Sequence, residues 1–281
     1  MINDDYNGEI KLSFINRNNR TLAKDTYHRG NSRISSEIPT TGSIPYYFLI
    51  STGGGFTEGE SYLQEVSLSD HTHAILTTQT PNYIYKCDNG LMTTQNNQVV
   101  VGEDCVLEYY LDETIPYENA NYRQYTDINM KSNSKLILTD GLTSGWSHND
   151  EPFKYRNVGI KTRIFVNGKL KYNDYLLVEP ANDPMDKIGY FEGSNNFNSV
   201  VIIDKDIDDQ TVKQMREFLQ KVETTSRYGI SLLEDYGLVL RVLGESAHNN
   251  RKLMWQFINF YREQILYYTH IDLRKSEHLE D

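Results

Sequence analysis

The chain has 281 residues and a formal net charge of −11, with 28 Lys and Arg against 39 Asp and Glu. Nucleic acids and anionic membranes are bound through clustered basic side chains, whereas the basic residues here are scattered, so neither is expected as a partner. A chain of this length can bury a large core without disulfides or metals, and we expect one domain spanning residues 1–281.

The N-terminal segment is acidic and lacks the apolar stretch of a secretory signal. No segment reaches the roughly 18 apolar residues that a membrane-spanning helix needs. The only cysteines are Cys87 and Cys105, which are too few for a disulfide framework or a four-cysteine zinc site. We therefore expect two reduced thiols in a cytoplasmic protein.

Residues that suit a pleated, half-buried surface are frequent, including 21 tyrosines. Strand-like segments recur about every 8–12 residues with turn signals between them, which indicates a mainly β architecture. A polar turn from Asn16 to Arg20 separates the first two segments. The predicted strands are 9–15, 22–28, 44–50, 62–68, 75–80, 83–85, 99–101 and 106–111.

Two Asn-Gly pairs, Asn89-Gly90 and Asn167-Gly168, predict tight hairpins. The pair is a strong signal because a type I′ turn needs positive φ at both central residues. The second lies between two β-prone arms. There, the predicted partners are Val166 with Lys169 and Phe165 with Leu170.

Apolar residues at helical spacing appear only late in the chain, over 208–222 and 247–268. Asp208 and Ser246 are placed to cap the two helices, because their side-chain oxygens can accept first-turn N–H groups. The segment 237–244 between them is predicted as a strand. Two further segments are expected to be irregular: a loop over 180–199 and a frayed tail from Arg274.

The glycine run Gly53–Gly55 does not form a nucleotide-binding motif. It lacks the Gly-Lys-Ser/Thr ending of a P-loop, and Glu58 stands where a dinucleotide fingerprint has its third glycine. The segment that follows is predicted as a strand, so no helix N-terminus would be available for phosphate.

Asp204, Asp206 and Asp208 have the spacing of a calcium loop, but Asp209 and Met215 occupy the positions that need Gly and Glu. We interpret these acids as a solvated turn and a helix cap. His71 and His73 lie two apart and would share a strand face, but no further ligand completes a metal set. Both histidines are predicted to be exposed residues of a strand. The sequence also contains no motif of a catalytic nucleophile.

Several segments together resemble the UreD (UreH) family of urease accessory proteins. The resemblance covers most of the chain and depends on the order and spacing of its elements, since none of them is specific alone. The segments are 53–60 (GGGFTEGE), 76–86 (LTTQTPNYIYK), 107–115 (LEYYLDETI), 136–153 (LILTDGLTSGWSHNDEPF), and 241–244 (RVLG) followed by a helix carrying Trp255.

The resemblance implies a β-helix-like stack of many short strands in a single domain, with two α-helices in the C-terminal part. It also implies a non-enzymatic scaffold or chaperone that binds apo-urease, recruits UreF and, through UreF, the GTPase UreG, and assists nickel insertion. The expected assembly is a dimer of UreD–UreF–UreG units. No tightly bound cofactor is expected, only transient passage of nickel.

Family proteins are thought to pass nickel through an internal tunnel lined by acidic and polar groups. Carried over by position, Glu60 matches the acid after the glycine motif, although Asp is commoner there. Asp140 matches the acid of the strand within 136–153, and Asp174 matches an acid after the second Asn-Gly turn. The competing interpretation of each is a turn cap or a surface charge. Nickel accepts carboxylate and water ligands, and a transfer path must bind weakly enough to release.

Two other functions remain open from the residues. The tyrosine content and acidic balance also fit a β-rich hydrolase or carbohydrate-active protein, although this rests on composition only. The glycine run and tyrosines could instead form an oligomer interface, which is compatible with the accessory role.

Overall fold

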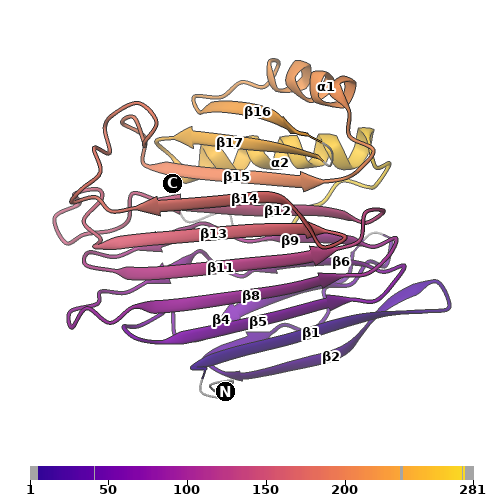
Figure 1. Ribbon diagram of the computed structural model, residues 1–281, viewed down its shortest axis with the longest axis horizontal. Helices are drawn as coiled ribbons and strands as arrows, with labels where there is room; N and C mark the ends of the chain where they lie inside the picture. Colours follow the sequence, from indigo (N-terminus) through magenta and orange to yellow (C-terminus); the bar gives the residue numbers. More distant parts are fainter. Residues whose placement is uncertain (1–5, 41, 235–236, 274, 276–281) are drawn as a thin grey trace.

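The computed structural model describes residues 6–40, 42–234, 237–273 and 275. The chain winds through two stacked sheets, and two helices cover one of them near the C-terminal end (Figure 1). Over those residues, the elements are β1 (Gly8–Arg17), β2 (Arg20–Gly30), β3 (Ser32–Ile34), β4 (Tyr46–Ser51), β5 (Ser61–Leu68), β6 (His73–Thr78), β7 (Asn82–Ile84), β8 (Thr93–Val101), β9 (Val106–Tyr110), β10 (Thr114–Pro116), β11 (Asn121–Met130), β12 (Lys135–Thr143), β13 (Asn157–Val166), β14 (Lys169–Val178), β15 (Asn196–Ile203), α1 (Asp209–Leu219), β16 (Arg227–Leu233), β17 (Gly237–Gly244) and α2 (Ala247–Gln264).

Strands in the middle of both sheets pair in parallel, because each coil of the chain returns in the same direction. The first sheet, called sheet A, has the order β14-β13-β11-β8-β5-β1-β2, with antiparallel pairs only at its edges. The second, called sheet B, has the order β16-β17-β15-β12-β9-β6-β4-β3, and β4, β6, β9 and β12 are parallel neighbours. The short strands β7 and β10 pair with each other beside them. This winding confirms the β-helix-like stack.

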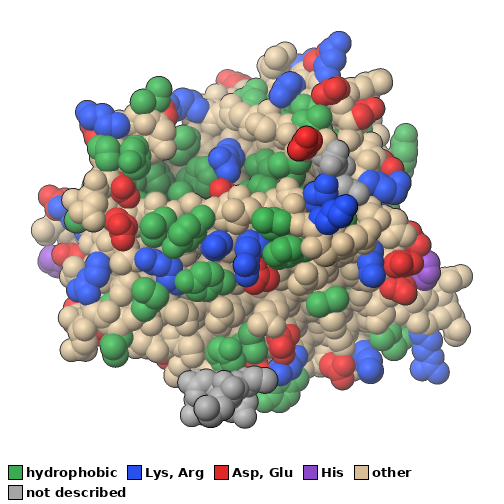
Figure 2. All heavy atoms as spheres, viewed as in Figure 1, with side chains coloured by type: hydrophobic (Ala, Val, Ile, Leu, Met, Phe, Trp, Pro, Cys, Tyr) green, Lys and Arg blue, Asp and Glu red, His purple; other side chains and the backbone are tan. Residues whose placement is uncertain are grey.

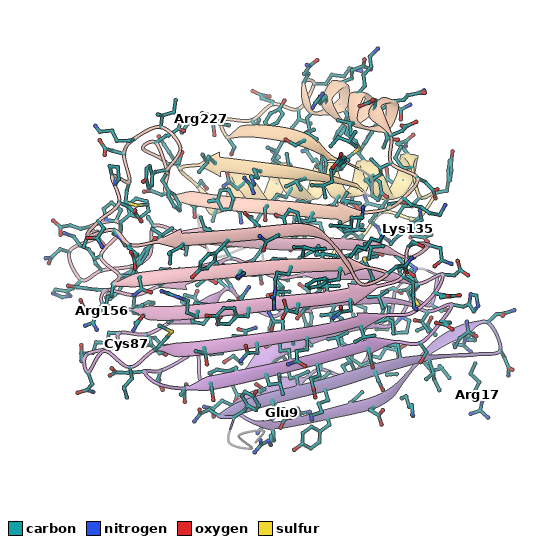
Figure 3. The ribbon with its side chains drawn as sticks, in the orientation of Figure 1. Glu9, Arg17, Cys87, Lys135, Arg156 and Arg227 are labelled. Carbon is teal, nitrogen blue, oxygen red and sulfur yellow. The ribbon has the colours of Figure 1, made fainter. Side chains whose placement is uncertain are left out.

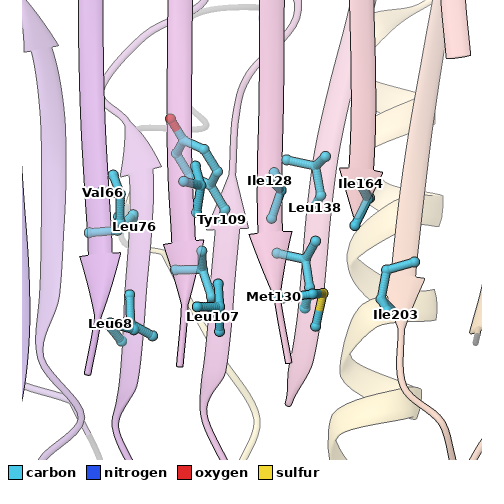
Figure 4. Packing of buried hydrophobic residues seen from close by; sticks show 14 of the residues in the cluster. Val66, Leu68, Leu76, Leu107, Tyr109, Ile128, Met130, Leu138, Ile164 and Ile203 are labelled. Carbon is cyan, nitrogen blue, oxygen red and sulfur yellow. The ribbon is translucent and has the colours of Figure 1, made fainter. Parts of the chain in front are cut away.

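The main core lies between the two sheets, where apolar side chains of both inner faces meet (Figure 4). Val66 and Ile128 of sheet A and Leu107 and Leu138 of sheet B are among its buried members. A second core lies between sheet B and the helices, where Phe257 of α2 is fully buried. Burial of this apolar area is the dominant stabilising term of the fold.

Both predicted helices form with their predicted caps. Asp208 Oδ1 accepts the backbone N–H of Thr211 at 2.8 Å, and Ser246 caps α2. The helices are shorter than predicted, since they end at Leu219 and Gln264. Strand β17 has the predicted bounds.

Asp208→Ala should lower the free energy of unfolding by about 1 kcal/mol, because a first-turn N–H loses its acceptor. Asp209→Ala is the matched control, since it removes an acid from the same turn but not the cap. Urea unfolding of the two variants checks this, and equal losses would contradict the capping role.

The Asn167-Gly168 hairpin is confirmed, with φ of 48° and 75° at the two residues and the predicted strand partners. The prediction of a hairpin at Asn89-Gly90 is wrong. The Gly90 N–H does bond the Cys87 carbonyl at 3.2 Å, so a tight turn forms. However, β7 pairs with β10, whereas β8 pairs with β5 and β11. The turn carries the chain from one face of the stack to another.

Residues 180–195 lie outside strands, but the predicted loop ends early because β15 begins at Asn196. Strand β16 was not predicted, although Tyr228, Ile230 and Leu232 alternate with polar or small residues. The predicted fraying of the tail from Arg274 lies outside the described residues, apart from Lys275.

The predictions for His73 and Asp204 are wrong, and the prediction for His71 is confirmed only in its exposure. His71 precedes β6 with a φ of 58°, so it does not share a strand face with His73. His73 is largely buried and contacts Glu108 at 2.7 Å. Asp204 is buried rather than solvated, with its carboxylate 2.5 Å from the Lys135 ammonium. For His73 and Asp204, a partner distant in sequence supplies the buried contact.

Cys87 and Cys105 are both buried and unpaired with each other. Among the residues placed in the structure, no helix is long and apolar enough to cross a membrane.

Candidate functional site

A row of polar side chains crosses the inner face of sheet A, within an otherwise apolar interior. Side chains of adjacent strands in register lie side by side on one face, so the row runs along the axis of the stack. The strand partners place Gln64 of β5 beside Asn97 of β8, then Thr126 of β11, Thr162 of β13 and Asp174 of β14. We call these five residues the polar row.

Hydrogen bonds join the first part of the polar row. The Gln95 amide donates to Asn97 Oδ1 at 2.8 Å, and the Asn97 amide donates to Thr126 Oγ1 at 3.0 Å. From sheet B, the Tyr109 hydroxyl donates to Gln64 Oε1 at 2.6 Å. Buried polar groups that are satisfied in this way specify one arrangement of the interior.

Asp140 faces the polar row from sheet B. It occupies an inward position of β12, between the core residues Leu138 and Leu142. The Gln124 amide donates to Asp140 Oδ2 at 3.0 Å, and the Gly141 N–H donates to Oδ1 at 2.8 Å. Burial raises the pKa of Asp140 to about 7, and the charge of Asp174 adds to the rise, while these two hydrogen bonds offset part of it. Near neutral pH this carboxyl therefore exchanges a proton readily.

Asp140 and Asp174 line the same small space, which we call the inner cavity. Its volume is about 20 Å³, and Thr162, Tyr172 and Ser199 contribute further oxygen atoms to its wall. A space of this size holds about one water molecule. The structure thus brings together two of the three acids that the family resemblance singled out.

Asp174 also lines a much larger space, called the outer pocket, of about 580 Å³. It lies between the edge strand β14 and the strands β16 and β17, where hydrophobic side chains gather around a hollow (Figure 2). Arg241 lines the pocket next to Asp174, and Arg227 projects near one end of β16 (Figure 3). Because Asp174 borders both spaces, it stands between the outer pocket and the inner cavity.

A third space, called the far cavity, has a volume of about 50 Å³ and is lined by Tyr62, Gln64, Gln95 and Gln124 among others. Gln124 lines this cavity and donates to Asp140. Asp174 is thus shared by the outer pocket and the inner cavity, and the hydrogen bond between Asp140 and Gln124 lies between the inner and the far cavity.

Glu60 lies apart from these acids. It follows the glycine run, where its carboxylate accepts the Thr57 N–H at 2.8 Å and the Tyr62 hydroxyl at 2.6 Å. These contacts hold the turn that leads into β5. Tyr62 belongs to the wall of the far cavity, so its hydroxyl links Glu60 to the interior.

This arrangement suits a divalent cation that passes through rather than stays. Carboxylate, amide and hydroxyl oxygens are acceptable ligands for such ions, with water completing the coordination. No three His, Cys, Asp or Glu side chains of the described ranges come together in a group that could hold a metal.

Sequence reasoning did not find the neutral members of the polar row or Arg241. Strand β8 carried part of the signal, because every second residue of its buried face can be identified from the sequence. Gln95 and Asn97 lie on this face together with Val99 and Val101. Only the parallel pairing shows that similar residues of the other strands fall beside them.

The model of the family described as UreD urease accessory protein matches residues 6–275. The chain belongs to the UreD family. A urease accessory protein UreD of Streptococcus thermophilus is 42% identical over 272 residues, covering 97% of this chain and 98% of that protein. UreD proteins of Actinomyces naeslundii and Lachnoclostridium phytofermentans are 31% and 27% identical over 270 and 243 residues, covering 98% and 88% of their lengths. UreD membership confirms the resemblance seen in the motifs and supports a role in urease maturation.

Proposed function

We propose that this chain is a non-enzymatic scaffold that passes Ni²⁺ through its interior to apo-urease. In this proposal it works in the cytoplasm, binds apo-urease, and recruits UreF and, through UreF, the GTPase UreG. Nickel is the cargo, and the chain holds no resident cofactor. The observation that supports this most is the alignment of outer pocket, Asp174, inner cavity, Asp140 and far cavity along the stack.

The two acids are suited to brief binding of the cargo. Asp140, with its pKa of about 7, can release a proton as a dication arrives and take one up as the ion leaves. The inner cavity is too small for a fully hydrated ion, so the ion must exchange some water for carboxylate oxygen there. Beyond it, the hydroxyls and amides of the polar row offer neutral oxygens that bind weakly.

The alternative of a carbohydrate-active hydrolase is less well supported. A sugar ring needs a groove of several hundred Å³ with both acids exposed to it. Asp174 and Glu192 both border the outer pocket, but each carboxylate is held by an arginine, Arg241 and Arg227 respectively. Asp140 lies in the wall of a cavity of about 20 Å³.

The direct test is urease activity in cells with and without this chain, at a fixed nickel supply. We expect activity only when the chain is present, and we expect the chain to co-purify with UreF. Equal urease activity in its absence, or binding to glycans without any complex with UreF, would overturn the proposal.

A further inference from the structure

Asp174, at the border of the outer pocket and the inner cavity, already has a cationic partner. The Arg241 guanidinium lies 3.0 Å from Asp174 Oδ1, and the Tyr172 hydroxyl donates to Oδ2 at 3.1 Å. Both carboxylate oxygens are therefore engaged. A metal ion arriving from the outer pocket meets a neutralised acid, because Arg241 stands on the pocket side.

The contact between these two residues can open. Arg241 extends from β17 in sheet B, whereas Asp174 belongs to the edge strand β14 of sheet A, so the pair spans the two sheets. The Arg241 side chain is 54% exposed, and ion pairs of such exposure contribute little net stability. The guanidinium can turn into the outer pocket, which has ample room for it.

We propose that Arg241 is the gate of the passage: it occupies Asp174 in the unloaded chain and must be displaced by the incoming divalent cation. The inference rests on the proposed nickel passage and deepens it. Arg241 acts through Asp174, so it is a positioning residue that keeps the affinity for the ion low. Low affinity at the mouth favours transfer over retention.

The test is equilibrium binding of Ni²⁺ alone to the purified full chain at low ionic strength. Arg241→Ala should bind about tenfold more tightly, because a cation within about 4 Å of the carboxylate no longer opposes the ion. This gain should shrink as salt is added, and Arg241→Lys should restore weak binding. A gain that persists at high salt, or that Arg241→Lys fails to reverse, would overturn the gate.

Arg163→Ala is the matched control. Arg163 forms a comparably exposed ion pair with Asp127 at 2.6 Å, and neither residue lines the outer pocket, the inner cavity or the far cavity. The control should leave nickel affinity unchanged, and adding Asp174→Asn to Arg241→Ala should cancel the gain. Equal tightening by the control, or no tightening by Arg241→Ala, would overturn the gate.

Failure of the gate can be distinguished from failure of the passage. Suppose that Asp140→Asn/Asp174→Asn abolishes urease activation but Arg241→Ala binds nickel as the native chain does. This result would support the nickel passage and contradict the gating role of Arg241. Suppose instead that this double variant activates urease fully while Arg241→Ala still tightens Ni²⁺ binding at Asp174. This result would support the contact between Arg241 and Asp174 as a control on binding and contradict the nickel passage.

Discussion

Arg262→Met should lower the free energy of unfolding by about 3–5 kcal/mol, the cost of leaving a buried charge without its partner. Arg262 and Glu108 are 2% and 0% exposed and form an ion pair between α2 and β9. His73 and Tyr110 complete the contacts of the Glu108 carboxylate. Met keeps the apolar stem but leaves the carboxylate with fewer compensating groups.

The loss should depend on pH. Burial opposes ionisation of Glu108, but His73 and Arg262 outweigh it, so the pKa of Glu108 lies below its ordinary value. A lowered carboxyl pKa gives stability that is present above the unfolded-state pKa and is lost as pH falls through the folded-state pKa. The effect of Arg262→Met should therefore be largest near neutral pH and smaller in acid.

Urea unfolding at several pH values measures this prediction. Arg163→Met is the control, because Arg163 forms an exposed pair with Asp127 and should cost less than about 1 kcal/mol. A loss below about 1 kcal/mol for Arg262→Met at neutral pH would contradict the buried-pair account.

Asp140→Asn should stabilise the metal-free chain and raise its free energy of unfolding at pH 8 by about 2–4 kcal/mol. The pKa of Asp140 is raised from 3.8 to about 7 in the folded state. A raised pKa gives stability that is complete below the unfolded value and is lost as pH rises through the folded value. At pH 8 the native chain has lost that stability, whereas an amide has no charge to bury.

The gain should vanish near pH 4, where Asp140 is protonated in the folded chain. Urea unfolding at both pH values tests this, with Asp127→Asn as the control, because Asp127 lies on the outer face of β11 beside Arg163. A destabilising effect of Asp140→Asn at pH 8, or an equal change at both pH values, would contradict the claim that ionisation of Asp140 destabilises the folded chain. A residue whose removal stabilises the fold is a candidate for a functional role.

The features predicted from sequence were those encoded locally. The Asn167-Gly168 turn, the caps at Asp208 and Ser246, and the strand 237–244 need only neighbouring residues, and all formed as predicted. Asn89-Gly90 carries the same local signal but fails as a hairpin, because the parallel coils decide which strands pair.

The candidate site was accessible from sequence only in part. Family position pointed to Asp140 and Asp174, which the structure places in one cavity, and to Glu60, which lies elsewhere. The polar row depends on register across five strands, and Arg241 reaches Asp174 from 67 residues away. Such long-range placements follow from the stack, not from any spacing along the chain.

The most direct test of the central claim is urease activation at limiting nickel by the Asp140→Asn/Asp174→Asn variant. As a matched control, Asp88→Asn/Asp127→Asn removes the same charge from acids that pair with Lys86 and Arg163 outside the three cavities. The account predicts that the first variant still assembles with UreF and apo-urease but activates about tenfold less or worse, while the control activates normally. Full activation by the first variant would contradict passage of nickel through this interior.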